Sequence, residues 1–358
     1  MSFVYTAGLN NMGSYQVSGR PWLKTIASLA DGTTQFLEFP NVSKRIRIKN
    51  NSTSGNSLFG FCTNPGSGIN FTTGTAGRID NSFTALPNFT VSFWCDLSEL
   101  GSGVAARSRI IDVNTPDEGS SNAFSIQMYK NSDTQIEFRF FTKNSGTAAF
   151  DTITVNVDSV NKWHNIALSV FGTSHKVYID GLLVGTRTGT GGGADGLIVG
   201  SATGPYQGGY DQMTLWNGAL TDPEILTLSQ YGAGDPRSSD LSITSATLVS
   251  WWAFESNLHK TFFATPDNAT TIFDRIASNN FTKQAGTYAF VDGFNLANVF
   301  NGNHFFKLQT LEEIELSCKT DSIVIKADGA TQSFDVYASL TGIPAERMYD
   351  LTGPGIDE

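Results

Sequence analysis

The sequence is poor in cysteine and in histidine, and it has no long apolar run, which excludes several classes of protein. Among its 358 residues are three cysteines, Cys62, Cys95 and Cys318, which lie too far apart for a CxxC metal or redox pair. We therefore expect buried free thiols. The four histidines show no H-x-H or H-x-x-x-H spacing, so zinc is not expected. No run of about 18 apolar residues is present, so no membrane-spanning helix is expected.

Charge is also scarce, because charged residues make up only 16% of the chain. Asp and Glu number 33 against 23 Lys and Arg, which gives a formal net charge of −10. This field repels phosphate backbones and no Lys/Arg run interrupts it, so nucleic acid is not an expected partner. The opening MSFVYTAGLNNMGSYQ has neither the basic nor the apolar segment of a secretory signal. We expect synthesis in a cytoplasm.

Glycine and aromatic residues are abundant, with 36 Gly and 26 Phe. Aromatic residues favour sheets and glycine favours turns, so the composition predicts an all-β protein. Short strand-like runs follow one another between residues 77 and 217 at the spacing of about 8 to 12 residues that sandwiches show. Asp180-Gly181 predicts a hairpin turn with positive φ at Gly181. One helix is expected in TDPEILTLSQYG, with Thr221 or Asp222 as its N-cap.

The two ends of the chain share one pattern. In KRIRIKN, Ile46 and Ile48 alternate with basic residues, and the tail from Phe305 contains similar short runs such as SIVIKA. We expect both ends to form one sandwich that carries the middle of the chain as an insertion. The expected parts are residues 1–63 with 305–358, a central domain over 64–244, and additional strands over 245–304. The last part either completes the central domain in permuted order or begins a truncated second repeat.

Four segments between residues 77 and 232 resemble the laminin-G-like, pentraxin-related branch of the concanavalin A-like jelly rolls. These segments are FTVSFWCDL (89–97), KWHNIALSV (162–170), VYIDGLLVG (177–185) and YQGGYDQMTLWNGALTDPEI (206–225). The resemblance implies a concanavalin A-like jelly-roll sandwich inserted into the smaller β-sandwich built from both chain ends. In such a fold, Trp163 and Trp216 are expected to be core aromatics.

The flanking segments SYQVSGRPW, EFPNVSKRIRIKN and SFDVYASLTGIPAERMYDLTGPGI are similar to virion proteins of marine tailed phages. In those proteins a small sandwich attaches to the capsid and lectin-like jelly rolls are displayed outward. The resemblance implies a decoration protein on the capsid surface, with the major capsid protein as its partner. We expect a closed homo-oligomer and favour a trimer, because many capsid sites are threefold.

An acidic capsid surface would attract the basic strand in the N-terminal part of the chain. The expected docking residues are Lys44, Arg45, Arg47 and Lys49. The alternative is that these residues form an ordinary solvated strand face.

Binding of host glycans would require exposed aromatic rings that stack on sugars. The candidates are Tyr206, Tyr210 and Trp252. Adjacent residues of a strand point to opposite faces, so Trp251 and Trp252 are expected on different faces. Either one of these two rings is partly exposed or both are covered.

Laminin-G-like and pentraxin folds often hold Ca²⁺ with Asp, Asn and backbone carbonyl groups at one rim of the sandwich. The candidate ligands are Asp80, Asn81, Asp112, Asn114, Asp117, Glu118, Asp211 and Gln212. The alternative is that they are ordinary turn residues bonded to their own backbone. No other cofactor is expected.

Catalysis is not expected, although glycosidases share this fold and use paired carboxylates. The nearest pair, Glu313 and Glu315, falls in the flanking sandwich, and alternating glutamates usually form a solvated strand face. The sequence therefore favours a structural virion protein. A freestanding Ca²⁺-dependent lectin is the alternative, and a glycoside hydrolase is the third hypothesis.

Overall fold

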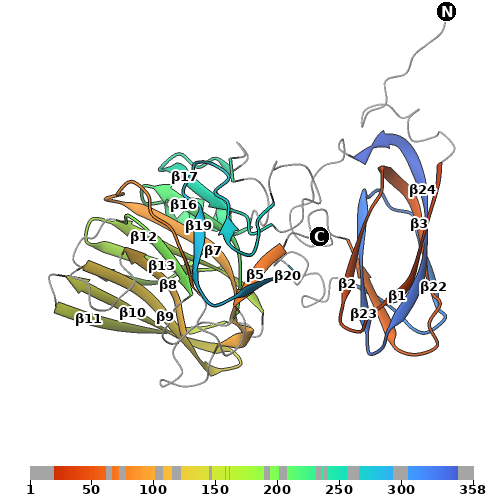
Figure 1. Ribbon diagram of the computed structural model, residues 1–358, viewed down its shortest axis with the longest axis horizontal. Helices are drawn as coiled ribbons and strands as arrows, with labels where there is room; N and C mark the ends of the chain where they lie inside the picture. The colour runs from red at the N-terminus through yellow and green to blue at the C-terminus, as the bar shows by residue number, and fades with distance from the viewer. Residues whose placement is uncertain are drawn as a thin grey trace, which may run out of the picture. The chain divides into compact units, whose positions relative to one another are not determined.

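The computed structural model divides the chain into two compact units (Figure 1). The terminal unit comprises Met1–Pro65 and Asn298–Glu358, and the central unit comprises Gly66–Ala297. The structure describes residues 20–61, 67–71, 78–100, 108–114, 122–144, 147–157, 159–160, 162–188, 194–200, 208–230, 236–237, 241–255, 266–292 and 305–345. Within these ranges, no helix is long and apolar enough to cross a membrane.

The terminal unit is a sandwich of two four-stranded antiparallel sheets. The first sheet has the order β1 (Arg20–Leu29), β24 (Gln332–Pro344), β3 (Asn41–Asn50) and β22 (Glu313–Leu316). The second has the order β2 (Thr34–Glu38), β23 (Ser322–Asp328), β4 (Asn56–Gly60) and β21 (Phe306–Leu308). N-terminal and C-terminal strands alternate in both sheets, as the red and blue ribbons of this unit show in Figure 1.

Alternation along the strands builds the core of this unit. Ile46 and Ile48 of β3 are 1% exposed, whereas Arg45 and Arg47 face solvent. The apolar side chains of β3 pack in one cluster with those of β23 and β24, among them the fully buried Phe334. Neither chain end can bury its apolar face without the other, so the two ends must fold together.

The central unit consists of two larger antiparallel sheets that enclose one apolar core. The helix-covered sheet has the order β14 (Leu182–Thr188), β13 (Ser174–Ile179), β12 (Trp163–Phe171), β7 (Phe89–Asp96), β16 (Gly209–Asn217), β5 (Ser67–Phe71) and β20 (Tyr288–Asp292), with β17 (Thr247–Trp252) also paired to β16. The opposite sheet has the order β11 (Thr147–Asn156), β10 (Gln135–Asn144), β9 (Asn122–Ser132), β8 (Ser108–Asn114), β15 (Leu197–Gly200), β6 (Arg78–Asp80), β19 (Phe281–Ala285) and β18 (Thr271–Ile272). A short 3-10 helix, η1 (Leu97–Glu99), follows β7.

Strands β17 to β20 belong to this same sandwich, although they follow its other strands in the sequence. Strand β17 pairs with β16, β19 pairs with β6, and β20 pairs with β5. Trp252 and Phe281 from this segment enter the main core, with their ring centroids 4.6 Å apart. Of the two arrangements that the sequence leaves open, the structure has completion of the jelly roll in permuted order.

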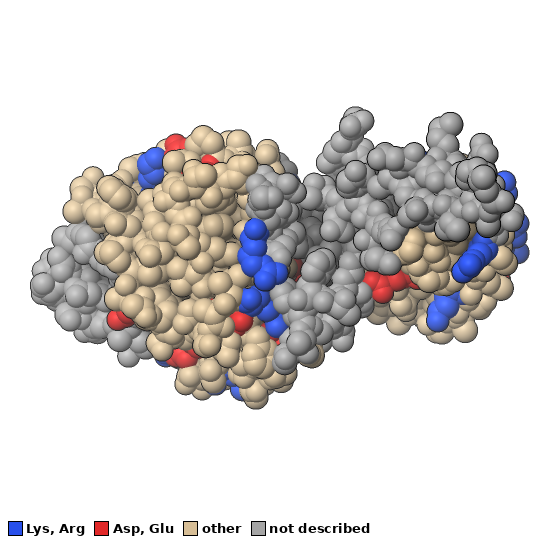
Figure 2. Space-filling model, turned by 90° about the horizontal axis from the view of Figure 1, so that it is seen from above, with Lys and Arg blue, Asp and Glu red and all other residues tan. Residues whose placement is uncertain are grey.

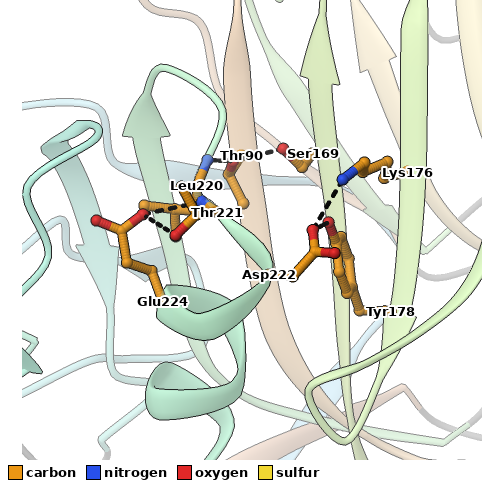
Figure 3. A network of polar contacts seen from close by, with 8 residues as sticks. All are labelled: Thr90, Ser169, Lys176, Tyr178, Leu220, Thr221, Asp222 and Glu224. Atoms are coloured by element: carbon orange, nitrogen blue, oxygen red, sulfur yellow. Dashed lines mark hydrogen bonds and ion pairs between the residues drawn. The ribbon is translucent and has the colours of Figure 1, made fainter.

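Helix α2 (Asp222–Gln230) packs on the outer face of the helix-covered sheet. Ile225 and Leu228 of the helix contact Tyr178 and Trp216 of the sheet in a second apolar cluster. The expected start of the helix is confirmed, with Thr221 directly before it. The Glu224 carboxylate accepts hydrogen bonds from the backbone N–H and hydroxyl of Thr221 at 2.9 and 2.7 Å, which is the carboxylate half of a capping box. Figure 3 shows this network.

The expected hairpin turn between β13 and β14 is confirmed. Asp180 and Gly181 have φ values of 49° and 79°, which a two-residue turn of type I′ requires. Gly181 is also needed for space, because an added Cβ would lie 2.7 Å from the Cα of Leu226 in α2. The turn therefore both reverses the chain and contacts the helix.

The free cysteines differ in burial. Cys95 is a fully buried thiol of the main core, as expected. The expectation of a buried thiol is wrong for Cys318, which is half-buried at the margin of the terminal core, and Cys62 lies outside the described residues.

Candidate functional site

The candidate site is the outer face of the opposite sheet in the central unit. The helix-covered sheet has its outer face occupied by α2 and by Leu241. In the opposite sheet, Ile79, Ile111 and Val199 point into the core, so the residues that alternate with them point outward. This alternation defines a polar outer row.

The polar outer row crosses neighbouring strands in register. Asp80 pairs with Ile198, Ile198 with Asp112, and Asp112 with Ser125. On β9 the outward positions continue with Gln127 and Tyr129, which alternate with core residues. Asp112, Ser125 and Gln127 are each about 4 to 5% exposed, so these polar groups are held in defined positions rather than on mobile surface chains.

Two charge contacts border this row. Arg78 Nη2 and Asp80 Oδ2 lie 2.6 Å apart, with both side chains 22% exposed. Tyr129 donates a hydrogen bond to Glu137 on the neighbouring strand β10. Because the other polar side chains of the row are buried, the partly exposed polar groups of the row and its bordering contacts are those of Arg78, Asp80 and Glu137. Groups of this kind can hydrogen-bond the hydroxyls of a sugar. The signal of this face in the sequence is the alternation in Ser125-Ile-Gln-Met-Tyr129, which by itself predicts only a strand.

The candidate calcium ligands are not brought together by the fold. Asp112 lies on the opposite sheet, whereas Asp211 lies on the outer face of the helix-covered sheet, where it pairs with Trp94. Asn81 uses its amide for structure, since Oδ1 accepts from the Leu197 N–H at 2.9 Å and Nδ2 donates to the Asn279 oxygen at 3.2 Å. Among the described residues, no three His, Cys, Asp or Glu side chains are grouped as metal ligands.

The remaining candidate calcium ligands lie in different parts of the central unit or outside the described residues. Gln212 is a buried structural residue with φ of 46°, and its Oε1 accepts a hydrogen bond from the indole of Trp251 at 2.8 Å. Asn114 is the last residue of β8. Asp117 and Glu118 lie outside the described residues.

The expectation that Tyr210 and Trp252 stack on sugars is wrong, because both side chains are 0% exposed. Tyr210 points between the sheets and donates its hydroxyl proton to the Ile110 oxygen at 2.6 Å. Trp252 donates from Nε1 to the Asn279 oxygen at 2.9 Å. Strand pairing turns these two residues toward the core, which their aromatic character alone does not decide. Tyr206 lies outside the described residues.

Trp251 and Trp252 do point to opposite faces, and both are covered. Trp252 lies in the main core, whereas Trp251 is 3% exposed on the other face of β17. There the guanidinium of Arg237 lies 5.8 Å from the centre of the Trp251 ring. The expectation that Trp163 and Trp216 are packed aromatics is confirmed, since they are 5% and 3% exposed.

The expected docking residues are exposed on the outer face of the first terminal sheet. Two of them have partners on β22: Arg47 Nε lies 3.3 Å from Glu313 Oε1, and Arg45 Nη1 lies 3.5 Å from Glu315 Oε1. Lys44 and Lys49 are also exposed. Glu313 and Glu315, the carboxylate pair weighed for catalysis, therefore flank basic side chains on the terminal unit.

Residues 70–226 match the family model described as the Concanavalin A-like lectin/glucanases superfamily. The matched residues lie within the central unit, whose two sheets form a jelly-roll sandwich of the kind found in this superfamily. No curated protein sequence matches the chain significantly.

Several solved structures are similar at low sequence identity. A Bacteroides ovatus protein assigned to carbohydrate binding has 11% identity and a TM-score of 0.44, covering 77% of this chain and 93% of that one. A heptameric SAP-like pentraxin from Limulus polyphemus has 15% identity and a TM-score of 0.38, covering 49% and 85%. The CBM40 of a Ruminococcus gnavus sialidase, bound to α2,3-sialyllactose, has 13% identity and a TM-score of 0.31, covering 48% and 96%. None of these similarities assigns a role to a residue of this chain.

Proposed function

We propose that the protein is a structural virion protein that docks on the capsid through its terminal unit and displays the central jelly roll to host glycans. The observation that carries this proposal is the topology. The N-terminal and C-terminal strands form one sandwich, and a jelly roll is inserted between them in the sequence. Such a chain has one module for attachment and another that is free to recognise a ligand.

The distribution of charge supports this division of roles. The terminal unit, residues 1–65 and 298–358, contains ten Lys and Arg against twelve Asp and Glu, a formal net charge of −2. The central unit contains 13 against 21, a formal net charge of −8. Figure 2 shows several Lys and Arg side chains on the terminal unit, which is at the right as in Figure 1. An acidic capsid surface would repel the strongly acidic central unit far more than the nearly neutral terminal unit.

The central unit supports recognition rather than catalysis. Its residues 70–226 match the lectin/glucanases superfamily model, and it carries a polar outer row of hydrogen-bonding groups. The only carboxylate pair singled out in the sequence, Glu313 and Glu315, belongs to the other unit. We therefore propose a role without enzymatic activity, with a homotrimer as the displayed form.

Mass spectrometry of virions purified from the source phage tests the attachment role. We expect the chain to be recovered with the particles at a fixed ratio to the major capsid protein. Recovery only from the soluble lysate would contradict the proposal. Sedimentation velocity of the purified chain tests the trimer separately.

A freestanding Ca²⁺-dependent lectin is a second candidate, favoured by the match of residues 70–226 to the Concanavalin A-like lectin/glucanases superfamily. A glycan array run with calcium and with a chelator distinguishes the two proposals. Binding that is lost with chelator, together with absence from virions, would favour the lectin. A reducing-sugar assay on the bound glycans tests the absence of hydrolysis.

A further inference from the structure

The outer face of the sheet β1–β24–β3–β22 presents an apolar and cationic row. Leu23 pairs with Tyr337, Tyr337 pairs with Arg47, and Arg47 pairs with Glu315, so one row crosses all four strands. The alternating residues Ile48 and Val336 are buried in the terminal core, which places this row on the outward side.

Leu23 is among the most exposed large apolar side chains of the described residues, at 69%, and Tyr337 is 37% exposed. Because neighbouring strands are about 4.8 Å apart, these two side chains form a continuous apolar surface. Exposing a leucine and a tyrosine side by side to water is unfavourable, and burying both side chains against another protein is favourable.

Cations lie beside this apolar surface on β3, and anions lie at the far edge on β22. The ion pairs of Arg45 with Glu315 and of Arg47 with Glu313 are 3.5 and 3.3 Å long between half-exposed side chains. Exposed pairs of this kind are weak, so the arginines can exchange these partners for carboxylates of another protein. Lys49 adds a further positive charge in the next row, where it pairs with Asp335.

We infer that Leu23, Tyr337 and Arg47 form the centre of the docking surface, and that its occupant is a capsid protein surface with an apolar centre bordered by carboxylates. This inference rests on the proposed function and moves the main contact from the basic strand alone to the row that crosses β1, β24 and β3. Charge complementarity selects the occupant: the cations of β3 border the apolar centre on one side, and Asp335 lies on the same face, so the partner must present carboxylates on the matching side of its apolar centre. Tyrosine and arginine at the centre are typical of contacts that dominate binding.

The test compares the full chain with the double variant Leu23→Ser/Tyr337→Ser in co-sedimentation with capsid shells purified without this protein. We expect the affinity for the shells to fall by at least about tenfold. The matched control is Leu182→Ser/Leu183→Ser, which changes two leucines that are 64% and 43% exposed on the central unit. The control is expected to bind like the natural chain. Circular dichroism melts verify folding, and Leu23→Ser alone serves if the double variant is unstable.

The outcomes separate this inference from the proposed function. If the natural chain does not bind shells, the proposed function fails. If it binds and the double variant binds equally well, the docking surface is wrongly assigned while the function stands. If the double variant loses self-association in sedimentation velocity but keeps its affinity for shells, the occupant is a second copy of this chain, and the inference is overturned.

Discussion

The buried imidazole of His164 bridges Asp180 and the backbone of Ser159. Its Nδ1 lies 2.7 Å from Asp180 Oδ2, and its Nε2 lies 2.7 Å from the Ser159 oxygen. Both partners are acceptors, and a neutral imidazole has only one N–H, so both hydrogen bonds form only with the imidazolium. Burial lowers the pKa of His164, but the hydrogen bond and charge of Asp180 outweigh burial and the nearby Lys162, so the pKa is raised.

The His164 bridge predicts a loss of stability in alkali. Because the folded state raises the pKa of His164, the stabilisation is complete below the unfolded pKa and disappears as pH rises through the folded pKa. We expect the melting temperatures of the natural chain and of His164→Gln to converge as the pH rises above the ordinary histidine pKa of 6.5. A difference that stays constant above this pH would contradict the imidazolium. Nitrogen-15 shifts of the ring at neutral pH provide a direct measurement, with both nitrogens protonated.

The lowered pKa of Glu224 predicts the opposite pH dependence, in which the folded state loses stability in acid. Burial alone raises its pKa, but hydrogen bonds from Ser245, Thr221 and Thr244 outweigh burial and lower the pKa to about 2. Its contribution is therefore present above the ordinary carboxyl pKa of 4.5 and is lost as pH falls toward about 2. Glu224→Ala is expected to cost about 2 kcal/mol of unfolding free energy at neutral pH, because it removes the carboxylate half of a capping box and the tie to Thr244 and Ser245.

Urea denaturation at neutral pH and near pH 3 checks the Glu224 prediction. The difference between the natural chain and Glu224→Ala should shrink at the lower pH. Asp133→Ala is the control, since Asp133 forms an ion pair with Lys130 but is 80% exposed. An equal loss in both variants would show that the cap has no special role.

The strand β3 and the start of α2 are predictable from the sequence because their signals are local. The alternation of Ile46 and Ile48 with arginines predicts a strand because one face of β3 is buried and the other is solvated. The helix start follows from Thr221 and Glu224, because their spacing lets the Glu224 carboxylate accept the Thr221 N–H. These signals lie within a few residues of one another, so they are readable without the tertiary structure.

The candidate site depends on pairing between distant strands, which the sequence does not display. Tyr210 and Asp211 are adjacent, and only the register of β16 sends the tyrosine into the core and the aspartate to the outer face. In the same way, Asp80 and Asp112 share a row because β15 lies between their strands. The role of polar side chains on a strand therefore becomes visible only when the sheet order is known.

Tyr210 joins the two sheets of the central unit, which makes its hydroxyl a structural group. Burial raises its pKa well above the ordinary value, so the hydroxyl stays protonated and donates to the Ile110 oxygen. Tyr210→Phe leaves this buried carbonyl without its donor and is expected to cost about 1 to 3 kcal/mol. Unfolding followed by tryptophan fluorescence reports on this unit, because Trp22 is the only one of the six tryptophans outside it. Tyr337→Phe on the terminal surface, followed by circular dichroism, should be neutral, and an equal cost in both variants would contradict the role of the buried bond.

Gly209 is required because the ring of Trp163 packs on the start of β16. A Cβ added at Gly209 would lie 2.5 Å from Cη2 of Trp163 and 2.7 Å from its Cζ2. The ring is 5% exposed and has no free side on which to move, so we expect Gly209→Ala to cost about 1 to 3 kcal/mol through overpacking. Gly342→Ala is the matched control, since an added Cβ there meets no atom within 4 Å. Chemical denaturation followed by circular dichroism measures both units, and an unchanged midpoint for Gly209→Ala would mean that Trp163 can reposition without loss.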